Sequence, residues 1–334
     1  MPFDVVFMGT PEFAVPSLLA LIEEGHQIVG VVTQPDKPKG RGRKVVPPPV
    51  KEVAAKFGLR VLQPRNVSDP DFLKSFFDLK PEIVVVVAFG QKIPSEILRF
   101  PKYGCVNLHG SLLPRYRGAA PIQRAIMNGE RETGVTTMYV TEEWDAGDII
   151  FSEKVDIPDD MTGGELHDEL AKRGARLLVR TLRAIQEGNA PRIPQDPEKV
   201  TLAPKLRPEE MEIDWSAQAR RIANLVRAMN PSPGAYTFHN GRLLKVWRVE
   251  SFPDVPGQGD PSGRHYGATS VPAASGEIAP GTVVEVGKKG GFTVKTGEGL
   301  LLIKEVQPQD GRKMAADEYM RGHPVRAGEV LGRK

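Results

Sequence analysis

Cysteine is almost absent, because Cys105 is the single one in a chain of 334 residues. One cysteine excludes an internal disulfide and a metal site built from clustered thiolates. Long hydrophobic runs are also missing, since no apolar run approaches the roughly 18 residues that suggest a membrane span. The first residues, MPFDVVFMGTPEF, have neither the basic start nor the long apolar core of a signal peptide. These absences predict a cytoplasmic protein without a membrane partner.

The chain has little excess charge of either sign, with a formal net charge of +3 at pH 7. Residues 1–200 carry 26 Lys and Arg against 27 Asp and Glu, whereas residues 201–334 carry 19 against 15. The basic excess therefore belongs to the C-terminal part. Such an excess allows an acidic polymer as a partner but does not require one.

Strand-like and helix-like segments alternate through the first half. The segment EIVVVVAFG is rich in β-branched residues, which is typical of a strand buried on both faces of a parallel sheet. Alternating elements of this length predict a doubly wound α/β domain with a mostly parallel sheet. We expect strands at 4–9, 27–34, 82–90 and 104–111, a hairpin over 133–157, and helices at 16–25, 50–58, 69–79, 120–129 and 162–188.

A proline-rich segment separates this half from a second pattern. Residues 189–208 contain five prolines and little periodicity, so we interpret 190–208 as a linker between domains. After a helix at 214–231 come short strand-like segments joined by turns, which predict a small antiparallel barrel of the OB-like kind. The expected domains are 1–189 and 209–334. The Gly, Ser and Pro-rich stretch 254–277 is expected to be a surface insertion.

The first strand ends at a glycine, which raises the question of a nucleotide site. A dinucleotide-binding turn needs the pattern G-x-G-x-x-G. Here Gly9 is present, but Pro11 occupies the position of the second glycine. No phosphate-binding P-loop pattern occurs elsewhere. The turn is therefore interpreted as an ordinary connection between a strand and a helix.

The stretch NLHGSLLPRYRG begins with two polar residues at the end of an expected strand. Side chains two apart on a strand share a face, so Cys105, Asn107 and His109 point the same way. Ligands of open α/β sheets bind beyond the carboxyl ends of the strands. An Asn amide can donate to an oxyanion, and a His can hold or pass a proton, which together suit acyl transfer to an amine. The alternative is a His bonded to the backbone beside an Asn that forms a turn.

Other chemistries at this strand end are less well supported. A carboxylate that would fix the His tautomer is available in WDAGD, but spacing alone does not choose between Asp145 and Asp148. His109 has no second His or Cys at the spacing of metal ligands, so no metal is expected. Ser111 lacks the G-x-S-x-G turn of a serine nucleophile. Cys105 is interpreted as a small buried hydrophobe.

A basic loop follows the second expected strand. Residues 34–51 carry six basic residues against one Asp, and Gly40 and Gly42 make the loop flexible. Such a charge run is either a solvated loop or a set of contacts to a nucleic acid backbone. The second domain offers further candidates for phosphate contacts. They are Arg220, Arg221, Arg227, Lys245 and Arg248.

The segment Asn107 to Ile122, together with DAGD at 145–148, resembles the formyltransferases that depend on 10-formyltetrahydrofolate. The chain is most similar to those members that formylate methionyl-tRNA. FMGTPEFAVPSL, VVVVAFGQKIP, ETGVTTM, IDWS and RAMNPSPGA match the segments of these enzymes in the same order, over most of residues 1–310. The stretch 254–277 is longer than is usual in the family, which affects only the boundaries of the barrel strands.

The resemblance implies roles for individual residues. It implies that Asn107, His109 and Asp145 are the catalytic group, with the Asn107 amide and the protonated His109 stabilising an oxyanion and Asp145 orienting His109. It implies that 10-formyltetrahydrofolate is the donor, tetrahydrofolate the product and initiator methionyl-tRNA the acceptor, without a metal. Apart from the resemblance, we expect a monomer, although the sequence itself does not give the oligomeric state. It assigns tRNA contact to Arg41, supported by Arg43 and Lys44. It assigns folate contact to Ser111, Leu112, Leu113 and Pro114.

Two other functions fit part of the pattern. Formyltransferases that act on a small amine, such as an amino sugar nucleotide or glycinamide ribonucleotide, share the Asn, His and Asp. The basic loop 34–51 and the basic second domain speak against a small acceptor. A non-catalytic RNA-binding protein would have no use for the polar group beside a complete folate motif.

Overall fold

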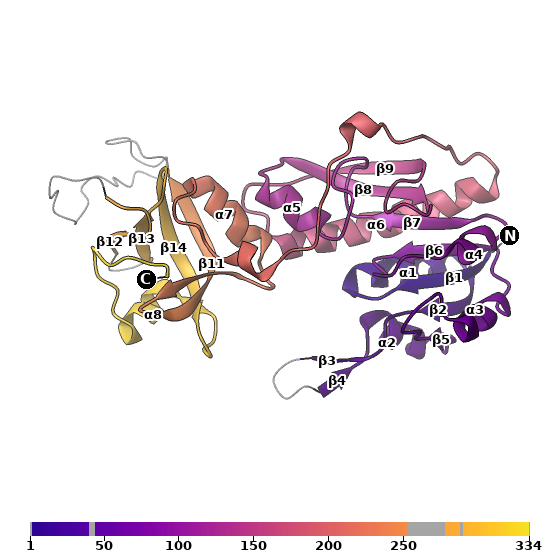
Figure 1. Cartoon of the computed structure of the whole chain (residues 1–334), viewed down its shortest axis with the longest axis horizontal. Helices are drawn as coiled ribbons and strands as arrows, with labels where there is room; N and C mark the ends of the chain where they lie inside the picture. Colours follow the sequence, from indigo (N-terminus) through magenta and orange to yellow (C-terminus); the bar gives the residue numbers. More distant parts are fainter. Residues whose placement is uncertain (1, 40–43, 253–277, 288–289, 334) are drawn as a thin grey trace. The chain divides into compact units, whose positions relative to one another are not determined.

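The computed structural model describes the chain except at 1, 40–43, 253–277, 288–289 and 334 (Figure 1). The expected insertion 254–277 therefore lies outside the described residues. The chain divides into two compact units. Unit 1 comprises Met1–Ile122, Glu132–Ile157 and Glu165–Lys205, and unit 2 comprises Gln123–Arg131, Pro158–Gly164 and Leu206–Lys334. None of the helices in the described parts is long and apolar enough to span a bilayer.

Unit 1 is built on a mostly parallel sheet with the strand order β5-β2-β1-β6-β7-β8-β9 (Figure 1). Neighbouring strands from β5 to β7 run parallel, and β8 and β9 follow antiparallel at one edge. The chain order reverses between β1 and β6, which confirms the predicted doubly wound fold. The strands are β1 (Asp4–Gly9), β2 (Gln27–Val32), β5 (Val61–Leu62), β6 (Ile83–Val87), β7 (Cys105–His109), β8 (Glu132–Tyr139) and β9 (Ile149–Asp156).

Helices cover both faces of this sheet. On one face, Phe76 of α3 and Ile97 of α4 belong to the same apolar cluster as Cys105 of β7. On the other, α6 approaches so closely that a Cβ on Gly174 would lie 2.6 Å from Leu108 Cδ2. Alternate side chains of β7 thus face opposite layers, as its period of two predicts. The helices of unit 1 are α1 (Val15–Glu23), α2 (Pro49–Lys56), α3 (Pro70–Phe77), α4 (Ser95–Arg99) and nearly all of α6 (Gly163–Gln186), whereas most of α5 (Pro121–Met127) belongs to unit 2.

The basic loop contains regular structure that was not predicted. β3 (Lys37–Lys39) and β4 (Lys44–Val46) pair antiparallel, with Lys37 opposite Val46. Val45 and Val46 favour extended backbone, and Pro38 is tolerated because this two-stranded ribbon consists of edges. Residues 37–39 and 44–46 of the loop thus form a short two-stranded ribbon.

The segment expected to be a linker belongs to unit 1 as far as Lys205. Ile193 forms an isolated antiparallel bridge with Ile149. The backbone N–H of Ala203 donates to the carbonyl of Arg117 over 2.7 Å. Its prolines therefore coexist with specific backbone pairing. The domain boundaries at 189 and 208 stay predictions.

Unit 2 contains the predicted antiparallel β domain, whose sheet order in the described residues is β10-β11-β14-β13-β12 with β15 beside β14. Asn240 and Gly241 join β10 to β11 with φ values of 51° and 74°, as a type I′ turn requires. Trp215 is buried and donates its indole N–H to Thr237. The elements are α7 (Ala219–Ala228), β10 (Ala235–His239), β11 (Arg242–Phe252), β12 (Val283–Val286), β13 (Phe292–Lys295), β14 (Leu300–Pro308), β15 (Met314–Ala315) and α8 (Ala316–Gly322).

One ion pair joins distant segments within unit 2. The Arg124 guanidinium makes two contacts with the Glu210 carboxylate, at 2.7 and 3.1 Å. The backbone N–H of Arg207 donates to the same carboxylate over 2.9 Å. The hydrogen bonds from Arg124, followed by the one from Arg207, lower the pKa of Glu210 from 4.5 to about 2. The ionised carboxylate is therefore more stable in the folded chain than in the unfolded one.

We expect Glu210→Gln to destabilise unit 2 by about 2 kcal/mol at pH 7, because the full shift is worth roughly 3 kcal/mol and partial exposure weakens it. A lowered carboxyl pKa stabilises the fold above the unfolded value, and that contribution falls as the pH drops from about 4.5 to about 2. Denaturant unfolding of both proteins between pH 7 and pH 2 measures the difference, which should shrink with acidity. Glu209→Gln, at the exposed neighbouring carboxylate, is the control. A difference that stays constant with pH would contradict this role of the pair.

Candidate functional site

Strand β7 brings the two predicted polar residues to the carboxyl edge of the sheet. Cys105, Asn107 and His109 share one face of the strand, as the sequence predicted. Pairing with β6 on one side and β8 on the other fixes the strand, with Asn107 opposite both Val86 and Met138. Asn107 is half-buried and His109 is buried. The end of β7 therefore presents a polar pair on a rigid support.

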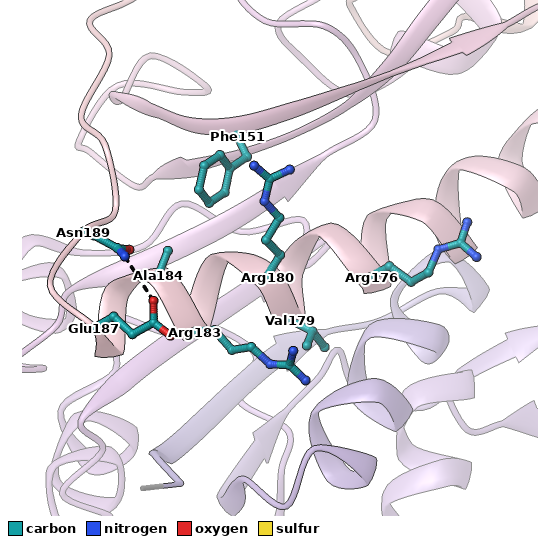
Figure 2. Close-up of a pocket in the computed structure, with 8 residues that line it drawn as sticks. All are labelled: Phe151, Arg176, Val179, Arg180, Arg183, Ala184, Glu187 and Asn189. Atoms are coloured by element: carbon teal, nitrogen blue, oxygen red, sulfur yellow. Dashed lines mark hydrogen bonds between the residues drawn. The ribbon is translucent and has the colours of Figure 1, made fainter.

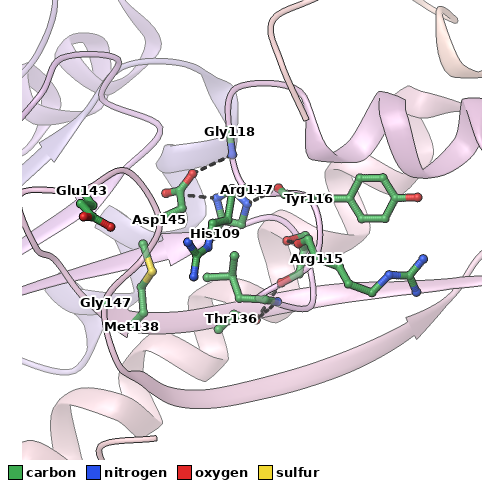
Figure 3. A network of polar contacts seen from close by, with 12 residues as sticks. His109, Arg115, Tyr116, Arg117, Gly118, Thr136, Met138, Glu143, Asp145 and Gly147 are labelled. Carbon is green, nitrogen blue, oxygen red and sulfur yellow. Dashed lines mark hydrogen bonds and ion pairs between the residues drawn. The ribbon is translucent and has the colours of Figure 1, made fainter. Parts of the chain in front are cut away.

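His109 has a defined tautomer. Its Nε2 lies 2.9 Å from the carbonyl oxygen of Tyr116, in the turn that follows β7 (Figure 3). A carbonyl oxygen only accepts, so Nε2 carries a hydrogen. Nδ1 lies 3.7 Å from Oδ1 of Asp145, and both side chains are about nine-tenths buried. Nδ1 is thus the ring nitrogen that faces the carboxylate.

Asp145 is held by its loop and by the turn after β7. Its backbone has a φ of 52°, and its Oδ2 accepts the backbone N–H of Gly118 over 2.8 Å (Figure 3). Asp148 lies instead within 3.6 Å of Arg192 Nη1, and its side chain is 37% exposed. The structure therefore brings Asp145, and not Asp148, to His109.

A small cavity lies next to Asn107 and Asp145, and both side chains line it. Apolar side chains of strands β6 and β8, and of the loops that follow these strands, form much of the remaining wall. Trp144 is 60% exposed, whereas the side chain of the next residue, Asp145, is 11% exposed. The other lining residues are Val86, Gln91, Lys92, Ile93, Met138, Val140, Thr141, Glu142, Glu143 and Trp144.

The stretch predicted to contact folate forms the turn after β7. Ser111 is fully buried, and its hydroxyl donates to the carbonyl of Arg115 over 2.6 Å. The hydroxyl of Thr136 in β8 donates to the Ser111 carbonyl and accepts the backbone N–H of Leu113. Leu112 and Pro114 are half-buried. None of these four residues is among those that line the cavity.

Cys105 and Ser111 are unsuited to nucleophilic chemistry. Burial raises the pKa of the Cys105 thiol to about 12, so the thiol stays protonated at neutral pH. The thiol lies 3.7 Å from the carbonyl of Ile97, within an apolar cluster. This confirms its interpretation as a small buried hydrophobe.

Two polar residues near the site were not predicted. Arg117 donates to the side-chain oxygen of Gln195 through Nε and Nη2, over 3.0 and 2.8 Å. Gln195 in turn donates to the carbonyls of Asp145 and Gly147. Gln195 was overlooked because the proline-rich composition around it suggested a linker, and sequence spacing contains no sign that a glutamine 50 residues away meets the loop.

The larger hollow of unit 1 lies along α6 and holds none of the predicted site residues (Figure 2). The Arg180 guanidinium is stacked 4.2 Å from the centre of the Phe151 ring. Arg183 pairs with Glu24 over 2.5 Å. Both arginines thus have partners within the protein, which accounts for their positions without a ligand.

The candidates for tRNA contact have different outcomes. Arg41 and Arg43 lie outside the described residues, and Lys44 begins β4. In unit 2, Arg220 pairs with Asp159, and Lys245 donates to the carbonyl of Pro233. Arg227 donates to the carbonyls of Pro158 and Met161. Arg221 and Arg248 are exposed.

No group of acidic, His and Cys side chains suited to a metal occurs in the described residues.

Two models of known protein families match successive parts of the chain. Residues 3–182 match the family model described as formyl transferase, and residues 205–324 match that of the formyl transferase C-terminal domain. A methionyl-tRNA formyltransferase of Moorella thermoacetica is 51% identical over 98% of this chain and 99% of its own length. One of Acetivibrio thermocellus is 48% identical over 98% of this chain and 99% of its own length.

Solved structures show the same fold at low sequence identity. An N-formyltransferase of Helicobacter canadensis, in complex with folinic acid and dTDP-3-aminofucose, has a TM-score of 0.64 at 17% identity, covering 92% of this chain and all of its own. HypX of Aquifex aeolicus, in complex with tetrahydrofolic acid, has a TM-score of 0.62 at 16% identity and covers 100% of this chain. This chain spans about half, 51%, of the length of HypX.

Proposed function

The chain belongs to the formyl transferase family, and we propose that it transfers the formyl group of 10-formyltetrahydrofolate to the α-amino group of methionine on initiator methionyl-tRNA. The product is N-formylmethionyl-tRNA for translation initiation. The observation that carries the proposal is identity of 51% and 48% to methionyl-tRNA formyltransferases over nearly the whole chain. Because this reaction serves translation, we place the enzyme in the cytoplasm, where it acts as a monomer.

In the proposed reaction, the amine nitrogen forms a bond to the formyl carbon, and the carbonyl becomes an oxyanion. The Asn107 amide donates to this oxyanion, and the imidazolium of His109 adds positive charge nearby. Asp145 faces Nδ1 of His109 at 3.7 Å and stabilises the charged ring. The amine loses its proton to water or to this pair, N10 of the folate gains one, and the bond from N10 to the formyl carbon breaks.

We place the ring of the donor in the cavity that Asn107 and Asp145 line, because its wall combines apolar side chains with amide and carboxylate groups that can hydrogen-bond a flat heterocycle. Ser111, Leu112, Leu113 and Pro114 then contribute in two ways. Buried Ser111 and Leu113 hold the turn to β8, while half-buried Leu112 and Pro114 are the members available for contact with folate. The role of these four residues rests on the family resemblance.

The proposal is tested by offering several acceptors side by side with 10-formyltetrahydrofolate. We expect formylation of charged initiator tRNA, and far slower reaction with charged elongator tRNA, glycinamide ribonucleotide or an amino sugar nucleotide. Transfer of a radioactive formyl group measures each rate. Preference for one of the small amines would replace the tRNA acceptor with a small-molecule one.

Asn107→Ala, His109→Ala and Asp145→Ala should each lower kcat by about 10²- to 10⁴-fold, because each removes a proton-transfer or oxyanion contact. Steady-state formylation gives kcat, and filter binding gives the tRNA affinity, which should stay close to that of the wild type. Asp148→Ala, in the same loop but turned to Arg192, is the matched control. Near-normal kcat in two of the three variants would refute the catalytic assignment.

We propose that Arg41, supported by Arg43 and Lys44, contacts the tRNA backbone. Arg41→Ala should lower kcat/KM for charged initiator tRNA and reduce the slope of log kcat/KM against log salt concentration by about 1. Hydrolysis of 10-formyltetrahydrofolate without tRNA should be unchanged. Lys56→Ala, at an exposed lysine of α2, is the control. Equal losses in formylation and hydrolysis would contradict a tRNA-specific role.

A further inference from the structure

The loop that carries Asp145 is held in a backbone conformation that it would not keep by itself. Asp145 has a φ of 52°, in the left-handed region that L-residues rarely occupy. Two residues on, a Cβ on Gly147 would lie 1.8 Å from the carbonyl oxygen of Tyr139, so the loop is pressed against β8. A left-handed residue persists only where its surroundings fix it. The fixing contacts are therefore part of the site.

Gln195 supplies those contacts. Its Nε2 donates over 2.8 Å to the carbonyl of Asp145 and over 2.8 Å to the carbonyl of Gly147. A side-chain amide has two hydrogens, and each carbonyl takes one. Its oxygen accepts both Nε and Nη2 of Arg117. Both hydrogens of the amide nitrogen and the amide oxygen thus have partners. The nitrogen must face the two carbonyls, which only accept, and the oxygen must face the guanidinium, which only donates.

Arg117 connects this support to His109. The preceding residue in the chain is Tyr116, whose carbonyl accepts the Nε2 hydrogen of His109. The following residue is Gly118, whose backbone N–H donates to the Asp145 carboxylate. The backbone of Arg117 is paired with Thr201 and Ala203, at 2.9 and 2.7 Å. The contacts close a ring that runs from His109 through 116–118 to Gln195 and Asp145. Every member of this ring belongs to unit 1.

We propose that Gln195 is a positioning residue, which holds the loop of Asp145 so that the carboxylate faces Nδ1 of His109. The inference rests on the proposed function, because it gives Gln195 a role only through Asp145. Gln195 does not itself line the donor cavity, but it contacts two residues that do, Asp145 and Met138. Loss of its two donors lets the loop leave the left-handed conformation, and the carboxylate then moves away from Nδ1. The chemical step suffers while substrate binding does not.

Two substitutions separate this role from simple packing. Gln195→Leu keeps the volume but removes the donors, and Gln195→Glu keeps the partner of Arg117 but cannot donate to two carbonyls. We expect both to lower kcat by about 100-fold, as a displacement of roughly 1 Å does, with both KM values nearly unchanged. Gln186→Leu, at an exposed glutamine of α6, is the control. A normal kcat in Gln195→Glu would show that only the contact with Arg117 matters. A normal kcat in Gln195→Leu would show that only the packing of the side chain matters. Either result overturns the proposal.

A double-mutant cycle identifies the route of the effect. In single-turnover formylation with excess enzyme, Gln195→Leu should cost about 100-fold in the wild type and almost nothing in an Asp145→Ala background. Equal costs in both backgrounds would mean a general structural effect and would overturn the positioning role. Failure of the proposed function looks different. In that case Asp145→Ala itself leaves formylation unchanged, or charged initiator tRNA is not formylated by the wild type.

Discussion

The hydrogen bond from His109 to the carbonyl of Tyr116 is the contact on which the rest of the site depends. It fixes the hydrogen on Nε2 and leaves Nδ1 facing the carboxylate of Asp145. To supply this carbonyl, the chain must turn back within seven residues of His109. Buried Ser111 and the hydroxyl of Thr136 satisfy the polar groups of that turn, and an unsatisfied polar group there would cost about 1–3 kcal/mol. The same turn then offers the N–H of Gly118 to Asp145.

Local periodicity was sufficient to predict β7 and its polar face. Asn107 and His109 alternate with apolar Val106 and Leu108, and a strand with that period can only present the polar pair on one side. The parallel sheet followed in the same way, from β-branched runs such as β6 that alternate with helical segments. The short hairpin of β3 and β4 was missed because glycines and charges in the loop conceal a short extended pair, Val45 and Val46.

Contacts over long sequence separation could not be predicted from the residues alone. Asp145 and Asp148 are equivalent by spacing, and the left-handed backbone at Asp145 decides which of them turns inward. Gln195 meets Asp145 from 50 residues away, in a segment whose prolines suggested a linker. Composition reports how stiff a segment is, but it does not report what that segment packs against. The family resemblance named Asp145, which is the aspartate that faces His109, whereas it contained nothing about Gln195.

The residues of the polar ring around His109 and Asp145 all lie in unit 1, and the last of them, Gln195, precedes Lys205. In this ring His109 bonds to Tyr116, Asp145 to Gly118 and Arg117 to Gln195, and all of these residues belong to unit 1. In unit 2, Arg220, Arg227 and Lys245 already have partners within the protein. A basic composition therefore overstates the donors that a polyanion could engage, since a paired guanidinium or ammonium offers only its remaining N–H groups.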